Sequence, residues 1–187
     1  MDDATRNATR ELVRSRFRSI PDFPKPGILF RDLMPVLADS EALAAGVDLH
    51  VDAAARITGD GLPASMIVGM ESRGFLFGMT LAARLRCGFA PVRKPGKLPG
   101  ATITESYALE YGDDTLEMQE DAVKPDSRVL IVDDLLATGG TAEATVRLVR
   151  RLGATVIGCV FLVELEGLGG ADRLAGVDVA HDAILKF

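Results

Sequence analysis

The 187-residue chain carries 21 lysines and arginines against 27 aspartates and glutamates, a formal net charge of −6 at pH 7. A chain of this length is expected to form a single domain, residues 1–187, whose core is large enough to need no disulfide or metal staple. The net acidity argues against nucleic acid or an anionic membrane as a partner, and no apolar run approaches the roughly 18 residues of a membrane span.

The cysteines and the N-terminal residues narrow the possible classes of protein further. Cys87 and Cys159 are far apart and form no CxxC pair, so neither a zinc site nor a disulfide framework is indicated. The first 17 residues, MDDATRNATRELVRSRF, are charged, which is unlike a signal peptide. We therefore expect a cytoplasmic protein.

The first third of the chain predicts two helices around a proline-rich segment. Apolar residues at helical spacing predict a helix over about residues 4–18. Three prolines and a glycine in PDFPKPG, residues 21–27, oppose regular structure there. An alanine-rich helix is expected over about 40–58, with Ser40 as its N-cap.

From residue 65 onward, short apolar runs alternate with helices. Helices are expected over about 75–85 and 140–152, the second closed by Gly153, and the apolar runs are 65–70, 89–92, 128–134 and 155–164. Continuous apolar runs between helices are typical of parallel strands that are buried on both faces. The prediction is an α/β fold with a mostly parallel sheet and right-handed crossovers. The C-terminal residues 177–187 are expected to form a last strand.

Residues 93–119 do not follow this alternation. Two extended runs around Gly112, Asp113 and Asp114 predict a β-hairpin, with too few apolar residues for a buried strand. An insertion of this length is usually a lid, a binding loop or a disordered segment.

The most informative segment follows the run 129–132. Asp133 and Asp134 stand at the expected carboxyl end of a strand, where ligands bind in open α/β sheets, and can accept hydrogen bonds from a vicinal diol. The next residues, ATGGT, open a helix, so backbone N–H groups, two threonine hydroxyls and the helix dipole favour an anion. Two acids that can bind a diol, followed by a loop that can bind a phosphate, suit ribose 5-phosphate as the ligand.

Other phosphate and nucleophile motifs are absent. The chain has no GxxxxGK[ST], and no GxGxxG follows a strand. The segment GMESRG misses the GxSxG spacing of a nucleophile elbow. His50 and His181 have no context of a general base and are expected to be structural or on the surface.

The 13 residues VLIVDDLLATGGT resemble the phosphoribosyl pyrophosphate (PRPP) motif of type I phosphoribosyltransferases. Residues 22–37, 70–78 and 93–112 are similar to the adenine-specific branch of that family, and the likeness spans roughly residues 10–170. The resemblance implies a five-stranded parallel core flanked by helices, a small N-terminal hood over the base at about 20–38 and a flexible β-hairpin lid at about 94–119. It also implies purine salvage, in which a homodimer transfers the 5-phosphoribosyl group from PRPP to adenine, giving AMP and pyrophosphate.

The family's functional residues carry over by matching positions. The family's residues that bind ribose and its 5-phosphate correspond to Asp133, Asp134, Ala137, Thr138, Gly139, Gly140 and Thr141. The residues that bind pyrophosphate correspond to Glu71, Ser72, Arg73, Arg93, Lys94 and Lys97. The adenine contacts match Leu29, Phe30, Arg31 and Leu165, with Phe30 stacking on the ring and the backbone of Leu29 and Arg31 reading its edge. Arg73 and Glu110 match catalytic positions, with Glu110 managing the proton at N7 of the base. Mg²⁺ is expected on PRPP oxygens and water, without dedicated protein ligands.

Three alternatives stay open at the level of sequence. A different acceptor, such as guanine, hypoxanthine or orotate, is disfavoured because the other branches lack the segment FPKPGILFRD. A PRPP-sensing regulator without catalysis usually has a DNA-binding extension and a basic surface, which this acidic chain does not offer. The third is a relative that has lost activity.

Overall fold

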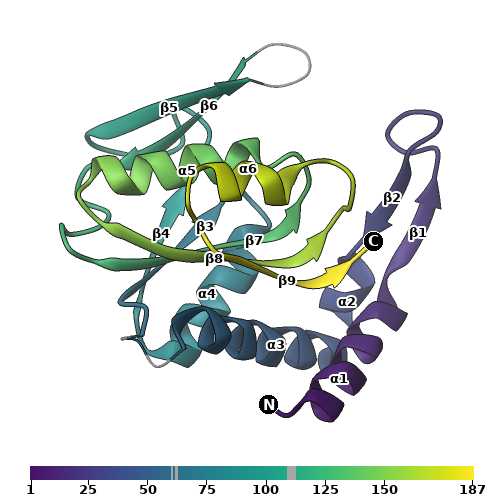
Figure 1. The fold of residues 1–187 in the computed structure, drawn as a ribbon. Coiled ribbons are helices and arrows are strands. Elements are labelled where there is room, and N and C mark those ends of the chain that lie inside the picture. The colour runs from purple at the N-terminus through teal and green to yellow at the C-terminus, as the bar shows by residue number, and fades with distance from the viewer. Residues whose placement is uncertain (60, 62, 109–112) are drawn as a thin grey trace.

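The computed structural model describes residues 1–59, 61, 63–108 and 113–187. Figure 1 shows the arrangement of its elements. The helices are α1 (Asp3–Arg16), α2 (Met34–Ala38), α3 (Ser40–Thr58), α4 (Gly74–Leu85), α5 (Gly140–Arg151) and α6 (Gly170–Gly176). The strands are β1 (Arg18–Pro21), β2 (Leu29–Asp32), β3 (Met66–Met70), β4 (Gly88–Val92), β5 (Thr102–Ala108), β6 (Asp113–Gln119), β7 (Arg128–Leu136), β8 (Thr155–Glu164) and β9 (His181–Lys186).

Five strands form one parallel sheet in the order β4-β3-β7-β8-β9. The predicted α/β fold with a parallel sheet is therefore confirmed. The order matters for function, because β3 has β4 on one side and β7 on the other, so the chain changes direction across the sheet after β4. The carboxyl ends of β3 and β7 thus frame a topological switch point, where open α/β sheets bind ligands.

Burial of β7 on both faces of the sheet explains why residues 129–132 are all apolar. Val129 and Ile131 pack in the core on one face of the sheet, whereas Leu130 and Val132 pack in the core on the other. All four are completely buried. A strand with two buried faces needs apolar residues at every position rather than at alternate ones.

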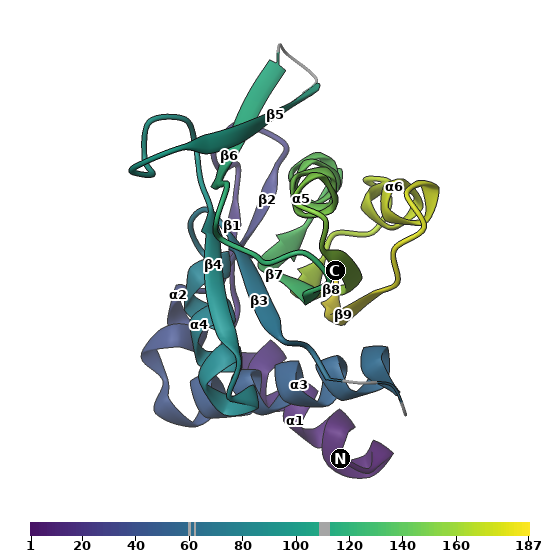
Figure 2. The same ribbon diagram turned by 90° about the vertical axis from the view of Figure 1, so that its left-hand side faces the viewer.

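Helices cover both faces of the sheet (Figures 1 and 2). Residues of α1, α2, α3 and α4 build the core on one face. The other face is covered by α5 and α6, and the hairpin β5–β6 packs against α5 at the top of Figure 1. The hairpin β1–β2 stands apart at the right of that view. In the described ranges no helix has both the length and the hydropathy that a transmembrane segment requires.

Several local predictions need correction. The N-cap of α3 is Asp39, whose carboxylate accepts the N–H groups of Glu41 and Ala42 at 3.0 Å, and Ser40 is already helical. Both residues are good caps, but the carboxylate satisfies two free amides at once. The short strands β1 and β2 and the helix α6 were not predicted, because each is too short to show a period.

The hairpin of residues 93–119 also differs from the prediction. Asp113 and Asp114 belong to β6, where they pair with Ala108 and Tyr107, so they are not the turn. Gly112, predicted as part of that turn, lies outside the described residues. The expectation of too few apolar residues for a buried strand is wrong for β6, because Leu116 and Met118 are buried in the core.

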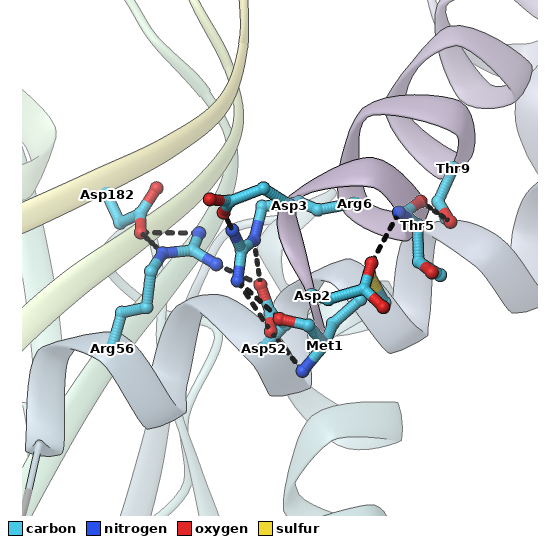
Figure 3. Close-up of polar contacts among 9 residues, drawn as sticks. All are labelled: Met1, Asp2, Asp3, Thr5, Arg6, Thr9, Asp52, Arg56 and Asp182. Atoms are coloured by element: carbon cyan, nitrogen blue, oxygen red, sulfur yellow. Dashed lines mark hydrogen bonds and ion pairs between the residues drawn. The ribbon is translucent and has the colours of Figure 1, made fainter.

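An ion-pair network around Asp52 of α3 fixes α1 (Figure 3). Arg6 Nε lies 2.6 Å from Asp52 Oδ2, and the amino group of Met1 lies 3.1 Å from Oδ1. Arg56 joins Asp52 to Asp182 of β9. Burial opposes the charge of Asp52, but these cations lower its pKa to about 2. Because α1 leads directly into β1, the network also fixes the base of the N-terminal hairpin.

We expect His50 to make the folding stability of the protein depend on pH. Its buried ring stacks on Phe77 with 4.7 Å between centroids, and burial lowers its pKa to about 4. An unfolded histidine titrates near 6.5, so between about pH 6.5 and 4 the unfolded chain takes up a proton that the folded protein refuses. Stability therefore falls as the pH falls through this window, by about 2 kcal/mol between pH 7 and 5.

Urea unfolding of the His50→Leu variant tests this prediction. The variant should lose about 2 kcal/mol less than the parent protein between pH 7 and 5, because it has no buried imidazole to protonate. His181→Gln, at a partly exposed histidine of β9, is the matched control and should behave like the parent. An equal loss in His50→Leu and the parent would contradict the prediction.

Candidate active site

A cavity of about 430 Å³ lies at the switch point between β3 and β7. It is lined by residues 70–73 after β3, by residues 133–142 from the end of β7 to the start of α5, and by Phe161. The structure thus brings together two segments that are 60 residues apart in sequence. Both had been predicted as ligand-binding segments.

The acid pair stands at the carboxyl end of β7. The N–H of Asp134 donates to Asp133 Oδ1 at 2.9 Å, and Arg73 Nε lies 2.7 Å from Asp134 Oδ2. Asp133 is partly exposed and lines the cavity, whereas Asp134 is 3% exposed.

Burial changes the pKa values of Asp133 and Asp134. Burial and then the charge of Asp134 raise the pKa of Asp133 well above its usual range. Burial also raises the pKa of Asp134, although Arg73 opposes this shift. Burial of two adjacent carboxyl groups therefore disfavours two full negative charges on this pair.

The loop after β7 has the geometry of an anion site. Gly139 has φ +78°, a conformation that favours glycine, and a Cβ there would lie 3.0 Å from the carbonyl oxygen of Gly170. The 12-residue helix α5 begins at Gly140, so the N–H groups at the helix start have no partner within the helix. The residues 137–141, all of which line the cavity, can therefore bind a phosphate group.

The segment after β3 presents Glu71, Ser72 and Arg73 to the same cavity. The Glu71–Ser72 peptide bond is cis. Glu71 accepts the N–H of Lys94 at 2.7 Å, and its Oε1 lies 3.3 Å from Arg93 Nη2. The hydrogen bond from Lys94, and then Arg93, hold the pKa of Glu71 below its usual value although burial raises it. Glu71 therefore joins the segment after β3 to the segment after β4.

The three basic residues after β4 that were predicted for pyrophosphate lie outside the cavity lining, unlike Arg73. Arg93 contacts Glu71 and donates to the carbonyl oxygen of Lys97 at 3.3 Å. Lys94 Nζ forms an ion pair with Asp114 of β6. The N–H of Lys97 donates to Glu117 at 3.0 Å. Each of these cations borders the site, but its described contacts are with the protein.

The residues predicted for adenine also lie outside the cavity lining, on β2 and after β8. Leu29 is 49% exposed, and the half-buried ring of Phe30 meets Phe23 edge-on with 5.1 Å between centroids. The guanidinium of Arg31 lies 4.6 Å above the ring of Phe187, so its side chain points to the C-terminus. Leu165 is partly buried, and its N–H donates to the carbonyl oxygen of Leu136 at 2.9 Å.

Sequence reasoning missed two buried acids that support the site. Asp32 accepts from Arg18 at 2.5 Å and from the N–H of Met34, which anchors the hairpin β1–β2. Glu117 accepts the N–H groups of Lys97 and Leu98 at 3.0 Å, which fixes the basic loop before β5. The only signal for Glu117 was an acid between two apolar residues of a strand. Glu110, by contrast, was singled out in the sequence but lies outside the described residues.

Comparison with known proteins identifies the family. The model of the phosphoribosyl transferase domain matches residues 34–179. The chain is 50% identical over its whole length to an adenine phosphoribosyltransferase of Pectobacterium carotovorum, of which it covers 98%. Among solved structures, the adenine phosphoribosyltransferase of Thermoanaerobacter pseudethanolicus is 47% identical with a TM-score of 0.88, over 95% of this chain and 99% of that one. That of Saccharomyces cerevisiae, complexed with adenine and an imino-altritol bisphosphate, is 37% identical with a TM-score of 0.90, over 96% and 99%. The chain therefore belongs to the adenine phosphoribosyltransferases of the phosphoribosyl transferase family.

Proposed function

We propose that the cavity between β3 and β7 is the site at which this enzyme of purine salvage transfers the 5-phosphoribosyl group of PRPP to adenine, giving AMP and pyrophosphate. One observation carries the assignment. The acid pair and the phosphate loop follow each other along one cavity wall, with Arg73 on the opposite segment. This order matches the chemistry of PRPP, which carries a diol between a phosphate and a pyrophosphate.

The ribose is held at two ends. Asp133 and Asp134 accept hydrogen bonds from the 2′- and 3′-hydroxyls, and the loop of residues 137–141 binds the 5′-phosphate. Fixing both ends places C1 between the leaving group and the base, which supplies the positioning part of catalysis. The C1–pyrophosphate bond breaks as positive charge develops on the ribose, so no nucleophilic side chain is required.

Pyrophosphate is bound by the segment 71–73 and by the basic residues after β4. Arg73 is suited to this role because its planar fork of N–H donors matches phosphate oxygens. In the structure it is paired with Asp134. Arrival of PRPP therefore exchanges partners, with Arg73 turning to pyrophosphate and the ribose hydroxyls turning to the acids. Arg93, Lys94 and Lys97 neutralise the remaining charge.

Mg²⁺ is the expected cofactor. The ion is bound mainly through PRPP oxygens and water, as suits Mg²⁺, which keeps several waters and binds substrate phosphates. Among the described residues no three His, Cys, Asp or Glu side chains gather into a metal cage. When bound, Mg²⁺ neutralises charge on the departing pyrophosphate.

Adenine stacks on Phe30 of the hood, residues 20–38, with Leu165 on its other side. The backbone groups of Leu29 and Arg31 read its edge, which agrees with an Arg31 side chain that is held by Phe187. Glu110 belongs to the lid, residues 94–119, and takes or gives the proton at N7 of the base. Closure of the lid keeps water from the activated ribose.

The enzyme is a homodimer in this proposal. Support comes from three large apolar side chains on α2 and α4, which lie on the same side of the molecule in Figure 2. Met34, Leu76 and Met79 are 57%, 48% and 53% exposed. Exposed apolar side chains of this kind mark interaction surfaces when they are contiguous. Sedimentation at twice the mass of the chain supports the dimer, and sedimentation as a monomer contradicts it.

The function is tested with a panel of bases. The protein, PRPP and Mg²⁺ are mixed with adenine, guanine, hypoxanthine or orotate, and the nucleotide formed is measured. We expect AMP from adenine and little product from the others. The Glu110→Ala variant, assayed in parallel, should lose kcat far more than it raises the KM for PRPP. PRPP binding without turnover of any base would instead support a PRPP-sensing regulator.

A further inference from the structure

Asp114, at the start of β6, is surrounded by donors on the border of the site. Its Oδ2 accepts the hydroxyl of Tyr107 at 2.9 Å and pairs with the ammonium group of Lys94. Its Oδ1 accepts the N–H of Thr115 at 2.9 Å. Tyr107 in turn accepts the hydroxyl of Thr141 at 3.2 Å. A single carboxylate thus connects a predicted pyrophosphate cation with a residue of the phosphate loop.

The position of Asp114 is well defined by the rest of its hairpin. Tyr107, which faces it from β5, is 9% exposed. Earlier in β5, Arg151 of α5 donates to the carbonyl oxygen of Thr104 at 2.6 Å and lies 3.1 Å from Glu105. The hairpin base is therefore docked on α5, and Lys94 meets an acid that does not move away freely.

Lys94 is consequently not available to a substrate in this state. Its side chain is 42% exposed, that of Asp114 is 27% exposed, and hydrogen bonds from Lys94 and Tyr107 keep the pKa of Asp114 below its usual value although burial raises it. The carboxylate is thus charged at neutral pH. It receives an ammonium and a hydroxyl, the same kinds of donor that a phosphate oxygen would receive.

We propose that Asp114 is an internal competitor of PRPP, which occupies Lys94 until the pyrophosphate group of the substrate displaces it. The inference rests on the proposed function, because it takes Lys94 as a pyrophosphate ligand and Thr141 as part of the phosphate loop. Asp114 acts through Lys94 and is a positioning residue. The proposed effect of Asp114 is to lower the affinity of the site for PRPP, although Asp114 borders that site.

The Asp114→Asn variant tests the proposal. Asparagine keeps the shape: its amide oxygen can accept the N–H of Thr115 and its amide N–H can donate to the hydroxyl oxygen of Tyr107, but it no longer pairs with Lys94. We expect the Kd for pyrophosphate with Mg²⁺, and for PRPP with Mg²⁺, to fall by about two- to fivefold, as suits a partly exposed ion pair. Isothermal titration calorimetry measures both. Mere damage to the hairpin would raise these constants, so a rise or no change overturns the proposal.

Three controls isolate the pair. Asp113→Asn removes the same charge at the exposed neighbouring residue and should leave both constants unchanged. Lys94→Met should weaken pyrophosphate binding, and Asp114→Asn should then have no further effect in the Lys94→Met background. An equal gain in both backgrounds, or in Asp113→Asn, would show that only the overall charge matters and would overturn the proposal.

The design also separates this proposal from the proposed function. Calorimetry reads binding without turnover, so a protein that binds PRPP but makes no AMP would still decide the role of Asp114. If Lys94→Met leaves both constants unchanged while adenine is still converted, the enzyme function stands and the competition is refuted. Thermal unfolding of each variant confirms that it is folded.

Discussion

Replacing Asp133 by Asn is expected to weaken PRPP binding by about ten- to a hundredfold and, at the same time, to make the ligand-free protein more stable at neutral pH. The loss of binding follows because a charged acceptor for a ribose hydroxyl is worth about 1.5–3 kcal/mol more than no contact. The Asp134 N–H keeps its partner, since the Asn amide oxygen can accept it as Asp133 Oδ1 does at 2.9 Å.

The gain in stability follows from the raised pKa of Asp133. Burial and the charge of Asp134 raise this pKa in the folded protein, whereas an unfolded aspartate titrates near 3.9. Above about pH 4 the folded state holds a proton that the unfolded state has released, so the stability of the parent protein falls as the pH rises. Asn carries no such penalty.

Calorimetric titration with PRPP and Mg²⁺, together with urea unfolding at pH 4 and pH 8, checks both effects. The free energy of unfolding of Asp133→Asn should exceed that of the parent at pH 8 and approach it near pH 4. Asp121→Asn, an exposed aspartate beyond β6, is the control and should change neither property. A variant that is less stable at pH 8, or that binds PRPP normally, would remove Asp133 from the role assigned to it.

Gly74→Ala should be a damaging single-methyl change at the site. A Cβ on Gly74 would lie 2.7 Å from the carbonyl oxygen of Val132 and 2.8 Å from Asp133 Oδ1. Gly74 begins α4, so the added methyl group would push the segment 71–73 away from the end of β7. Overpacking of this kind costs about 1–3 kcal/mol of stability.

The catalytic consequence should exceed the loss of stability. A displacement of the two cavity walls should lower kcat/KM for PRPP at least about tenfold, because positioning is sensitive to shifts of this size. Gly176→Ala in α6 is the matched control, since a Cβ there meets nothing within 4 Å. Comparable kcat/KM values for the two variants would mean that the contact between Gly74 and Asp133 does not hold the site together.

The architecture was predictable where the chain repeats one physical requirement. Every residue of β7 from Val129 to Val132 is buried against one core or the other, and this gave the apolar run from which the strand was predicted. The short elements were not predictable. The hairpin β1–β2 depends on Asp32 binding Arg18 across 14 residues, and the buried face of β6 depends on a core that other elements supply.

The site was predictable where its residues are neighbours in sequence. Asp133, Asp134 and the phosphate loop form one continuous segment, so their order alone indicated a ribose phosphate. Contacts between segments had no such signal. Arg73 with Asp134, and Tyr107 with Thr141, join residues that are distant in the chain, and only the folded structure brings them together.

The charge of the chain takes on a definite meaning in this structure. A protein with a net charge of −6 repels a polyanion overall, so local cations must attract it. Three of these cations are paired with acids in the structure: Arg73 with Asp134, Arg93 with Glu71, and Lys94 with Asp114. In the function proposed above, the acids keep the cations ordered and PRPP binds by exchanging partners.

A crystal structure of the protein with AMP tests the central claim most directly. The account predicts the phosphate at the N–H groups of residues 137–141, the ribose hydroxyls within hydrogen-bond distance of Asp133 and Asp134, and the adenine ring against Phe30. AMP bound with its phosphate elsewhere, for example at Arg93 and Lys97, or with its ribose away from the acid pair, would contradict the account.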